Sequence, residues 1–389
     1  MELNIDKTEW KSYRFDEFAQ NISQRVDPKQ TDLEIYVGLE HLDPDSLHIK
    51  RNGTPADVEG TKLKFYTGDV IFGKRRAYQR KAALAKTDGI CSAHAMVLRA
   101  NTKLMDERLF PFFFHSKVFQ DVAEKISVGG LSPTINWKDL AKQEFLLPPK
   151  DQQARLAELL WAVDEVVERE MEVKGTLQIS RQSLMKKLFS NEKHSKTPLY
   201  KLPILEVNGL WRTDEDVETI EVMVIRSTEF SDFGKICFDK LESMPVKLSQ
   251  YKSRKLLPDD IIVERSGGGP DQPVGRVCFF ENTEGEYSFS NFTSCIRLKN
   301  NKIVLPRYLF YFLQYYWEMK GTDRIQNQTT GIRNLDYDLY KRIKIPLSEI
   351  EDQKETIKLI EDVQSGIDLQ LSQITISEKL KQGLINEIF

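Results

Sequence analysis

The stretch QARLAELLWAVDEVVEREMEVKGTLQISRQSLMKKLF, residues 153–189, has a second version, QKETIKLIEDVQSGIDLQLSQITISEKLKQGLINEIF, at residues 353–389. The two copies align without a gap at an offset of 200 residues (353 − 153 = 200), with apolar positions opposite apolar positions. A repeat of this size divides the chain into two halves, each a variable block followed by a helical arm. The pattern predicts two similar heads held at a fixed separation.

Apolar residues recur along each arm at intervals of three or four positions or at sums of these intervals, the spacing typical of a helix with one apolar stripe. They are Leu156, Leu160, Val163, Val167, Met171, Leu177, Leu184 and Leu188 in the first arm, and Ile360, Val363, Ile367, Leu371, Ile374, Leu384 and Ile388 in the second. Such a stripe must be covered by another surface. We expect the arms to pair as an antiparallel coiled coil, a rod of roughly 55 Å at ~1.5 Å per residue.

The blocks before the arms combine β-rich runs with one aromatic helical run each. Predicted strands are Glu34–Val37, Lys62–Phe65, Asp69–Phe72, His94–Arg99 and Glu144–Leu147, then Glu221–Arg226, Asp260–Val263, Thr293–Leu298 and Arg342–Pro346. Predicted helices are Tyr13–Ile22, one from Arg108, and Pro306–Lys320. The fold class is therefore α+β, with two similar domains joined by two long antiparallel helices. The predicted parts are a head at 1–150, an arm at 151–190, a linker at 191–199, a head at 200–349 and an arm at 350–389.

Composition sets limits on the class of protein. The 389 residues include no apolar run of 18 or more, and the polar start of the chain argues against secretion. Four scattered cysteines show no paired spacing and indicate free thiols in a reducing cytoplasm. The five histidines have no metal-ligand spacing, so no metal is expected.

Positive charge is concentrated locally although the net charge is −3 and the pI about 6.1. Six basic residues and no acidic one lie between Lys74 and Lys86, whereas the arms are rich in aspartate and glutamate. Phosphate contacts require local positive charge on one face, not a high overall charge. The heads are therefore the candidate nucleic-acid-binding parts.

A set of short motifs occurs in the same order in both halves. In the first half they are Val37-Gly-Leu-Glu-His-Leu, Gly68-Asp-Val-Ile-Phe-Gly-Lys, Asp88-Gly-Ile-Cys-Ser, Gly129-Gly-Leu-Ser-Pro, Ile135-Asn-Trp-Lys-Asp-Leu and Leu147-Pro-Pro-Lys-Asp-Gln-Gln; the last is matched by Ile345-Pro-Leu-Ser-Glu-Ile-Glu-Asp-Gln. Over essentially its whole length the chain resembles the specificity (S) subunit of type I restriction–modification systems. The second half departs from the pattern, with Leu347 in place of the second proline and Pro258 or Asp259 at the position of Gly68.

The resemblance implies two target-recognition domains that read the halves of a split, double-stranded DNA sequence. It also implies that the helical arms recruit two methyltransferase (modification) subunits, which the restriction/translocase subunits then join. No cofactor and no membrane is implied for this chain. S-adenosylmethionine chemistry would belong to the methyltransferase.

Side chains for base and phosphate contacts follow a predicted strand in each head. The candidates are Lys74, Arg75, Arg76, Tyr78, Gln79, Arg80 and Lys81 in the first head, and Lys252, Arg254, Lys255, Arg265, Gln272 and Arg276 in the second. A solvated basic loop and a flexible hairpin tip are the simpler interpretations of these two segments. Near the start of the first arm, Trp161 and Glu165 are candidates for partner contact, although Trp161 could equally pack beneath its own head.

Motifs for catalysis are missing from the sequence. There is no phosphate-binding Gly-x-x-x-x-Gly-Lys-Ser/Thr loop, and the glycines at 267–269 follow a strand but open no predicted helix. The hypothesis is a non-catalytic DNA-recognition subunit. The alternatives are a coiled-coil scaffold that binds proteins through duplicated heads and, less well supported, a self-contained nuclease.

Overall fold

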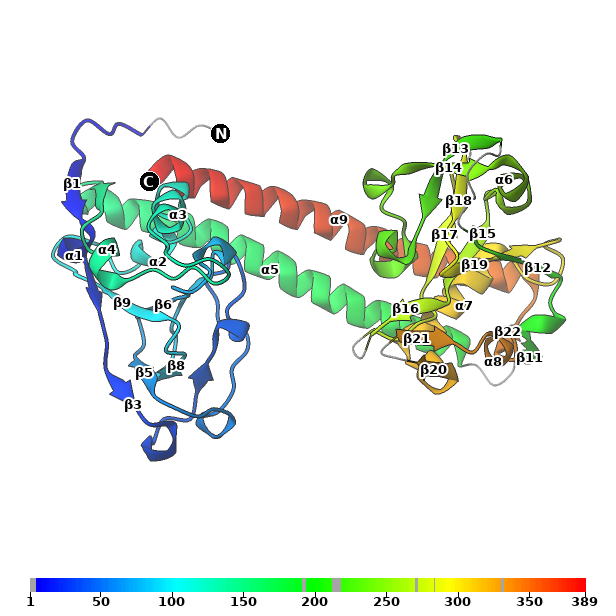
Figure 1. Ribbon diagram of the computed structural model, residues 1–389, viewed down its shortest axis with the longest axis horizontal. Coiled ribbons are helices and arrows are strands. Elements are labelled where there is room, and N and C mark those ends of the chain that lie inside the picture. Colours follow the sequence, from blue (N-terminus) through cyan, green and yellow to red (C-terminus); the bar gives the residue numbers. More distant parts are fainter. Residues whose placement is uncertain (1–4, 191–193, 212–217, 270–271, 283, 330–331) are drawn as a thin grey trace. The chain divides into compact units, whose positions relative to one another are not determined.

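The computed structural model describes residues 5–190, 194–211, 218–269, 272–282, 284–329 and 332–389 (Figure 1). The chain forms two compact units, one of Met1–Val173 with Gln370–Phe389 and one of Lys174–Leu369. Each unit holds one head: head 1 is residues 5–149, and head 2 is residues 194–349.

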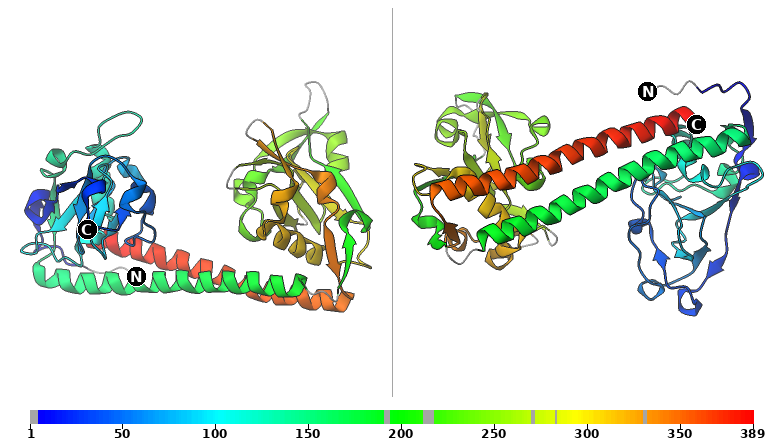
Figure 2. Two further views of the ribbon diagram at one scale, coloured as in Figure 1. Left: turned by 90° about the horizontal axis from the view of Figure 1, so that it is seen from below. Right: turned by 180° about the vertical axis from the view of Figure 1, so that it is seen from behind.

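Two long helices, α5 (Lys150–Phe189) and α9 (Ile350–Ile388), each contribute to both units. The first part of α5 shares its unit with the last part of α9, and the last part of α5 shares the other unit with the first part of α9. This is the pairing of antiparallel helices, and the segments lie side by side within each unit (Figure 2). The predicted antiparallel coiled coil is confirmed. In the part of the chain that is described, no helix is long and apolar enough to cross a membrane.

Both heads are built on the same four-stranded antiparallel sheet. Its order is β2-β9-β6-β7 in head 1 and β12-β19-β15-β17 in head 2. The strands are β2 (Ala19–Asn21), β9 (Met96–Ala100), β6 (Val70–Phe72) and β7 (Ala82–Leu84), then β12 (Ile204–Asn208), β19 (Thr293–Leu298), β15 (Asp260–Glu264) and β17 (Val277–Phe280). The central pairs Ile71↔Val97 and Ile262↔Cys295 are equivalent, so the prediction of two similar heads is confirmed.

A buried carboxylate repeats at the same place in both sheets. Asp69 accepts two hydrogen bonds from Arg99, at 2.7 and 3.0 Å, and Asp260 accepts two from Arg297, at 2.7 and 2.6 Å. Both carboxylates are fully buried, so each depends on its arginine for charge compensation.

The residue before each buried aspartate has left-handed backbone, with φ of +91° at Gly68 and +73° at Asp259. The position of Gly68 in the second half is therefore taken by Asp259, not Pro258.

A second shared element ties each head to the start of a long helix. β1 (Lys11–Arg14) pairs with β10 (Glu144–Leu147), and β11 (Ser195–Pro198) pairs with β22 (Lys344–Leu347). The predicted linker thus contains a strand.

The predicted helix over 13–22 is wrong. Only α1 (Phe15–Phe18) is helical, and the flanking residues pair in β1 and β2. The spacing of Phe15 and Phe18 suggested a helix, but pairing with β10 and β9 determines the backbone on either side.

The heads diverge outside this frame. Head 1 adds the sheet β3-β5-β8-β4, whereas head 2 adds β14-β13-β18 with helix α6 (Leu248–Arg254). The bounds are β3 (Arg25–Val26), β5 (Lys62–Phe65), β8 (Gly89–Cys91), β4 (Tyr36–Val37), β14 (Ser243–Lys247), β13 (Thr219–Ile225) and β18 (Tyr287–Phe289). A further sheet in head 2 joins β16 (Ser266–Gly268), β21 (Ile332–Leu335) and β20 (Gln326–Thr329).

Aromatic helices form the core of each head and bind it to the long helices. In head 1 they are α2 (Phe110–Phe113) and α3 (Lys117–Lys125), and in head 2 the helix is α7 (Pro306–Glu318). Phe113 contacts Phe389, the residue that follows α9, and Phe189 of α5 packs edge-on against Tyr308 of α7. Each head is thus anchored on the end of one long helix, through equivalent phenylalanines.

Candidate nucleic-acid interface

The basic loop of head 1 is held in a defined conformation. It leaves β6 and contains one helical turn at Ala77–Gln79, flanked by Arg76 and Arg80 with left-handed φ of 57° and 53°. The amide of Arg76 donates to the carbonyl of Pro133 at 2.7 Å, and the amide of Ile135 donates to the carbonyl of Lys74 at 3.0 Å. The loop and the turn 128–134 therefore form one surface.

Five of the seven sequence-predicted residues in this loop lie on that surface or at its edge. Arg76 is exposed and its Nε donates to Ser132 Oγ at 3.3 Å, and the ring of Tyr78 is 52% exposed. Within the described ranges, the side chains of Lys74, Arg75, Tyr78 and Gln79 have no hydrogen-bond or ion-pair partner. These groups are available to a ligand.

Arg80 and Lys81 are instead occupied by contacts inside the unit. Arg80 forms an ion pair with Asp45 at 2.8 Å, and its Nη2 donates to Gln382 of α9 at 3.3 Å. Lys81 Nζ donates to the carbonyl of Leu39 at 2.7 Å. Both side chains stabilise the head. The run of basic residues in the sequence does not show which of them stabilise the head and which bind a ligand.

The equivalent segment of head 2 begins at Arg265, whose side chain already has contacts within the head. The amide of Leu335 donates to the carbonyl of Arg265 at 2.8 Å, as that of Ile135 does to Lys74, so Arg265 takes the place of Lys74. Arg265 donates to Asn208 Oδ1 at 2.8 Å and its guanidinium lies 4.4 Å from the ring centre of Tyr337.

Arg276 is the most strongly bound of the predicted arginines. Its Nε and Nη2 donate to both oxygens of the buried Glu264, at 2.8 and 2.7 Å, and Nη2 also donates to the carbonyl of Ser227. Turned so that its amide oxygen faces the guanidinium, Gln272 accepts from Arg276 at 2.8 Å. Burial alone would lower the pKa of Arg276, but the carboxylate of Glu264 raises it. The pair is part of the head's interior.

Helix α6 carries two of the other predicted residues of head 2, Lys252 and Arg254, and Lys255 directly follows it. Lys252 is exposed, and none of the described residues forms a hydrogen bond or ion pair with it. Arg254 Nε donates to the carbonyls of Asn208 and Gly209, at 3.1 and 3.2 Å, and Lys255 pairs with Glu286 at 3.0 Å. Lys252 is therefore the available cation on this helix.

Trp161 packs beneath head 1. The sequence had left open whether this side chain packs there or contacts a partner. Its indole Nε1 donates to the carbonyl of Arg108 at 2.9 Å, and its ring contacts that of Phe112 edge-on. Glu165, one turn later on α5, is exposed and pairs with Arg169.

Ion pairs also join each head to a long helix in its unit. These ion pairs were not predicted from the sequence. In unit 1 the buried Asp164 of α5 contacts His48 of head 1 at 2.7 Å and Lys381 of α9 at 3.2 Å. Burial would raise the pKa of Asp164, but the hydrogen bond from His48 and the charge of Lys381 lower it. Both ion-pair partners lie far from Asp164 in sequence, so no local signal could have revealed them.

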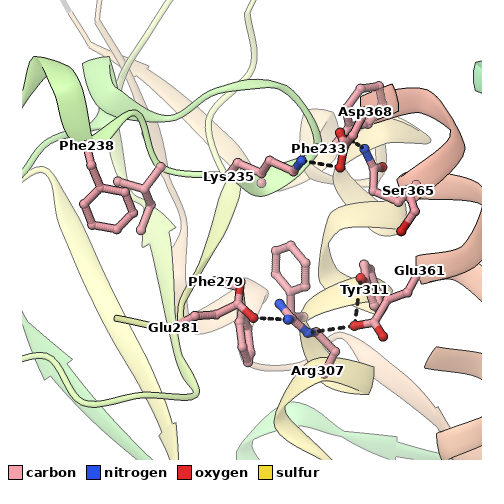
Figure 3. A pocket seen from close by; sticks show the side chains of 14 residues that line it. Phe233, Lys235, Phe238, Phe279, Glu281, Arg307, Tyr311, Glu361, Ser365 and Asp368 are labelled. Carbon is pink, nitrogen blue, oxygen red and sulfur yellow. Dashed lines mark hydrogen bonds and ion pairs between the residues drawn. The ribbon is translucent and has the colours of Figure 1, made fainter. Parts of the chain in front are cut away.

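In unit 2 a hollow of about 530 Å³ separates head 2 from α9. Figure 3 shows Arg307 between Glu281 and Glu361, while Lys235 reaches Asp368. The guanidinium of Arg307 also lies 4.1 Å from the ring centre of Phe279. These paired charges attach head 2 to α9.

Two heads on one frame, with different outer surfaces and a shared pair of helices, define a two-headed recognition protein. The family model described as "Type I restriction modification DNA specificity domain" matches residues 8–177 and 210–382. The chain belongs to this family and contains two copies of its recognition domain.

Curated relatives are specificity subunits. The chain is 29% identical over 199 residues to the EcoDI specificity subunit of Escherichia coli, covering 49% of this chain and 44% of that one. It is 22% identical over 353 residues to the MjaVIII specificity subunit of Methanocaldococcus jannaschii, covering 82% and 75%. The match to the EcoDI subunit, and to a further relative, the MjaX specificity subunit, spans only about half of the length of each.

Solved structures support the fold. A chain from a study of complex assembly and conformational transition of the type I R-M system has a TM-score of 0.60 at 17% identity, covering 97% of both chains. The S subunit of a type I system from M. genitalium has a TM-score of 0.55 at 15% identity, covering 100% of this chain and 98% of that one.

Proposed function

We propose that this chain is the non-catalytic DNA-recognition subunit of a type I restriction–modification complex, in which each head reads one half of a split double-stranded DNA sequence. The observation that carries the proposal is a shared frame with unlike surfaces. The four-stranded sheet, the buried Asp–Arg pair and the anchoring strand repeat. The second sheets share one parallel pair, β4 with β8 and β13 with β18, but their remaining strands, β3 and β5 in head 1 and β14 in head 2, pair differently. Such heads bind in equivalent ways to unlike sequences.

In head 1 the reading surface is the loop Lys74–Gln79 with the adjoining turn 128–134. Arg75 and Arg76 carry the planar donors that recognise guanine in the major groove, and Gln79 carries the amide that recognises adenine. In head 2, Lys252 on α6 supplies a phosphate contact. The other candidates have contacts within their own units and are assigned to stabilising the heads; they are Arg80, Lys81, Arg254, Lys255, Arg265, Gln272 and Arg276.

The partners are two methyltransferase subunits and, through that assembly, the restriction/translocase subunits. The long helices offer the partner surface, with the exposed Glu165 as one contact. Trp161 packs against head 1, where its indole donates to the carbonyl of Arg108. The four cysteines are free thiols, three of them buried, which suits a reducing cytoplasm.

A binding selection tests the proposal. The full chain, with and without its methyltransferase partner, is incubated with duplexes of random sequence, and the bound fraction is sequenced. A motif of two short halves separated by a fixed gap is expected. Absence of any enriched motif under both conditions would favour a protein-binding scaffold instead.

A further inference from the structure

A polar hollow of about 310 Å³ lies between the two sheets of head 1. Its lining includes three cations, Arg25, Lys62 and Lys74, and the neutral polar side chains of Asn21, Ser23 and Asn136. No aspartate or glutamate is among the described residues that line it, and most of the remainder are apolar. Unlike the charged hollow of unit 2, which contains its own carboxylates, this one has positive charge alone.

The polar groups around the hollow are largely without partners. In the portion of the chain that is described, the side chains of Arg25, Lys74 and Asn136 make no hydrogen bond or ion pair. Lys62 donates to the carbonyls of Glu59 and Gly60, which leaves its charge in place. Arg25 is exposed, whereas Lys74 is half-buried. A half-buried cation without counter-charge is costly, and burial together with the charge of Arg25 lowers the pKa of Lys74.

In head 2 the side chain at the same position has contacts within the head. There Arg265 replaces Lys74 and is held by Asn208 and the ring of Tyr337. Tyr337 begins helix α8 (Tyr337–Tyr340), as Trp137 begins the equivalent helix α4 (Trp137–Leu140) in head 1. Lys74 is shorter and has no hydrogen-bond or ion-pair partner among the residues described, so the site in head 1 is open.

We propose that this hollow binds one phosphate group of the DNA backbone, an inference that rests on the proposed function and adds a specific phosphate site to it. A phosphate is bound well by a lysine ammonium, a guanidinium and neutral amide donors. The hollow offers these groups around an uncharged lining. Lys74 begins the loop that carries Arg75 and Arg76, so a phosphate held here fixes that loop against the neighbouring base edges.

The test measures how the affinity of the full chain for short random-sequence duplexes depends on salt. Each lost phosphate contact reduces the slope of log K against log salt by about one, equally for all sequences. Lys74→Ala and Arg25→Ala are each expected to show this loss. Lys74→Arg, which keeps the charge, and Lys103→Ala, an exposed lysine outside the hollow, are expected to keep the wild-type slope.

A second arm separates DNA phosphate from a free anion. Inorganic phosphate is added to the wild type and to Lys74→Ala, and the thermal midpoint of each is compared; a larger increase in the wild type supports the site. An unchanged salt slope in both alanine variants would overturn the inference. If phosphate nevertheless raised the thermal midpoint of the wild type more than that of Lys74→Ala, the ligand would be a free anion. A wild type that binds no duplex would contradict the proposed function itself.

Discussion

Gln153 and Gln353, one at the start of each long helix, make the same three hydrogen bonds in the two units. The Oε1 of Gln153 accepts from a head 1 amide at 2.6 Å, and that of Gln353 accepts from a head 2 amide at 2.9 Å. The Nε2 of each donates to two carbonyls, one in the head and one before the helix, at 2.8 to 3.0 Å. Both side chains are buried, so each glutamine joins its head to a long helix.

Replacing either glutamine with alanine is expected to destabilise one unit. The change leaves one part-buried amide and two carbonyls without the glutamine as partner, at a cost of about 2–4 kcal/mol. Urea unfolding followed by the fluorescence of the heads would measure it. Gln182→Ala, on an exposed position of α5, is the control. Equal midpoints for all three variants would show that these hydrogen bonds contribute little.

His115 makes the stability of unit 1 dependent on pH. Burial lowers the pKa of this side chain to about 4, below the ~6.5 of an unfolded chain. Between those values the unfolded chain binds a proton that the folded chain does not, so the free energy of unfolding falls as the pH decreases through this window.

The variant His115→Gln should lose less stability than the wild type between about pH 7 and about pH 5, by roughly 2 kcal/mol. Urea unfolding at the two pH values measures the difference. The exposed His94→Gln is the control, and a wild-type pH dependence retained in His115→Gln would contradict the assignment.

Substitutions of two arginines in the basic loop are expected to differ in their effects on DNA binding and on thermal stability. Arg75→Ala should weaken binding to one half of the target by about 1–3 kcal/mol. It should not change the thermal midpoint, because the Arg75 side chain has no partner among the described residues. Arg80→Ala should instead lower the thermal midpoint, because it removes the contacts with Asp45 and Gln382. Binding to duplexes altered in one half at a time, together with thermal unfolding, distinguishes the two. Identical behaviour of the variants would remove the loop from the reading surface.

The arms, the central strands and the aromatic helices could be predicted from sequence because apolar spacing determines them locally. The offset of 200 residues between the copies is kept in the structure, where β10 and β22 occupy residues 144–147 and 344–347. The anchoring strand β11 was not predicted, because its polar sequence, SKTP, has no strand pattern and its pairing with β22 is long-range.

The candidate site was only partly predictable, for a related reason. A run of basic residues indicates positive charge but not which side chains already have partners. Arg276 is paired with Glu264 and Arg80 with Asp45, whereas Arg75 is free to bind within the ranges described. Arg25 was missed because it lies 49 residues before Lys74 (74 − 25 = 49) and meets it only in the folded head.

We proposed that two unlike heads read the two halves of one interrupted DNA sequence. The decisive experiment maps the methylated bases in the genome of a cell that carries this chain together with the proposed methyltransferase partner. We expect a single methylated motif of two short, different halves at a fixed gap, with Arg75→Ala relaxing only one half. Methylation of an uninterrupted motif, or relaxation of both halves by that one substitution, would contradict it.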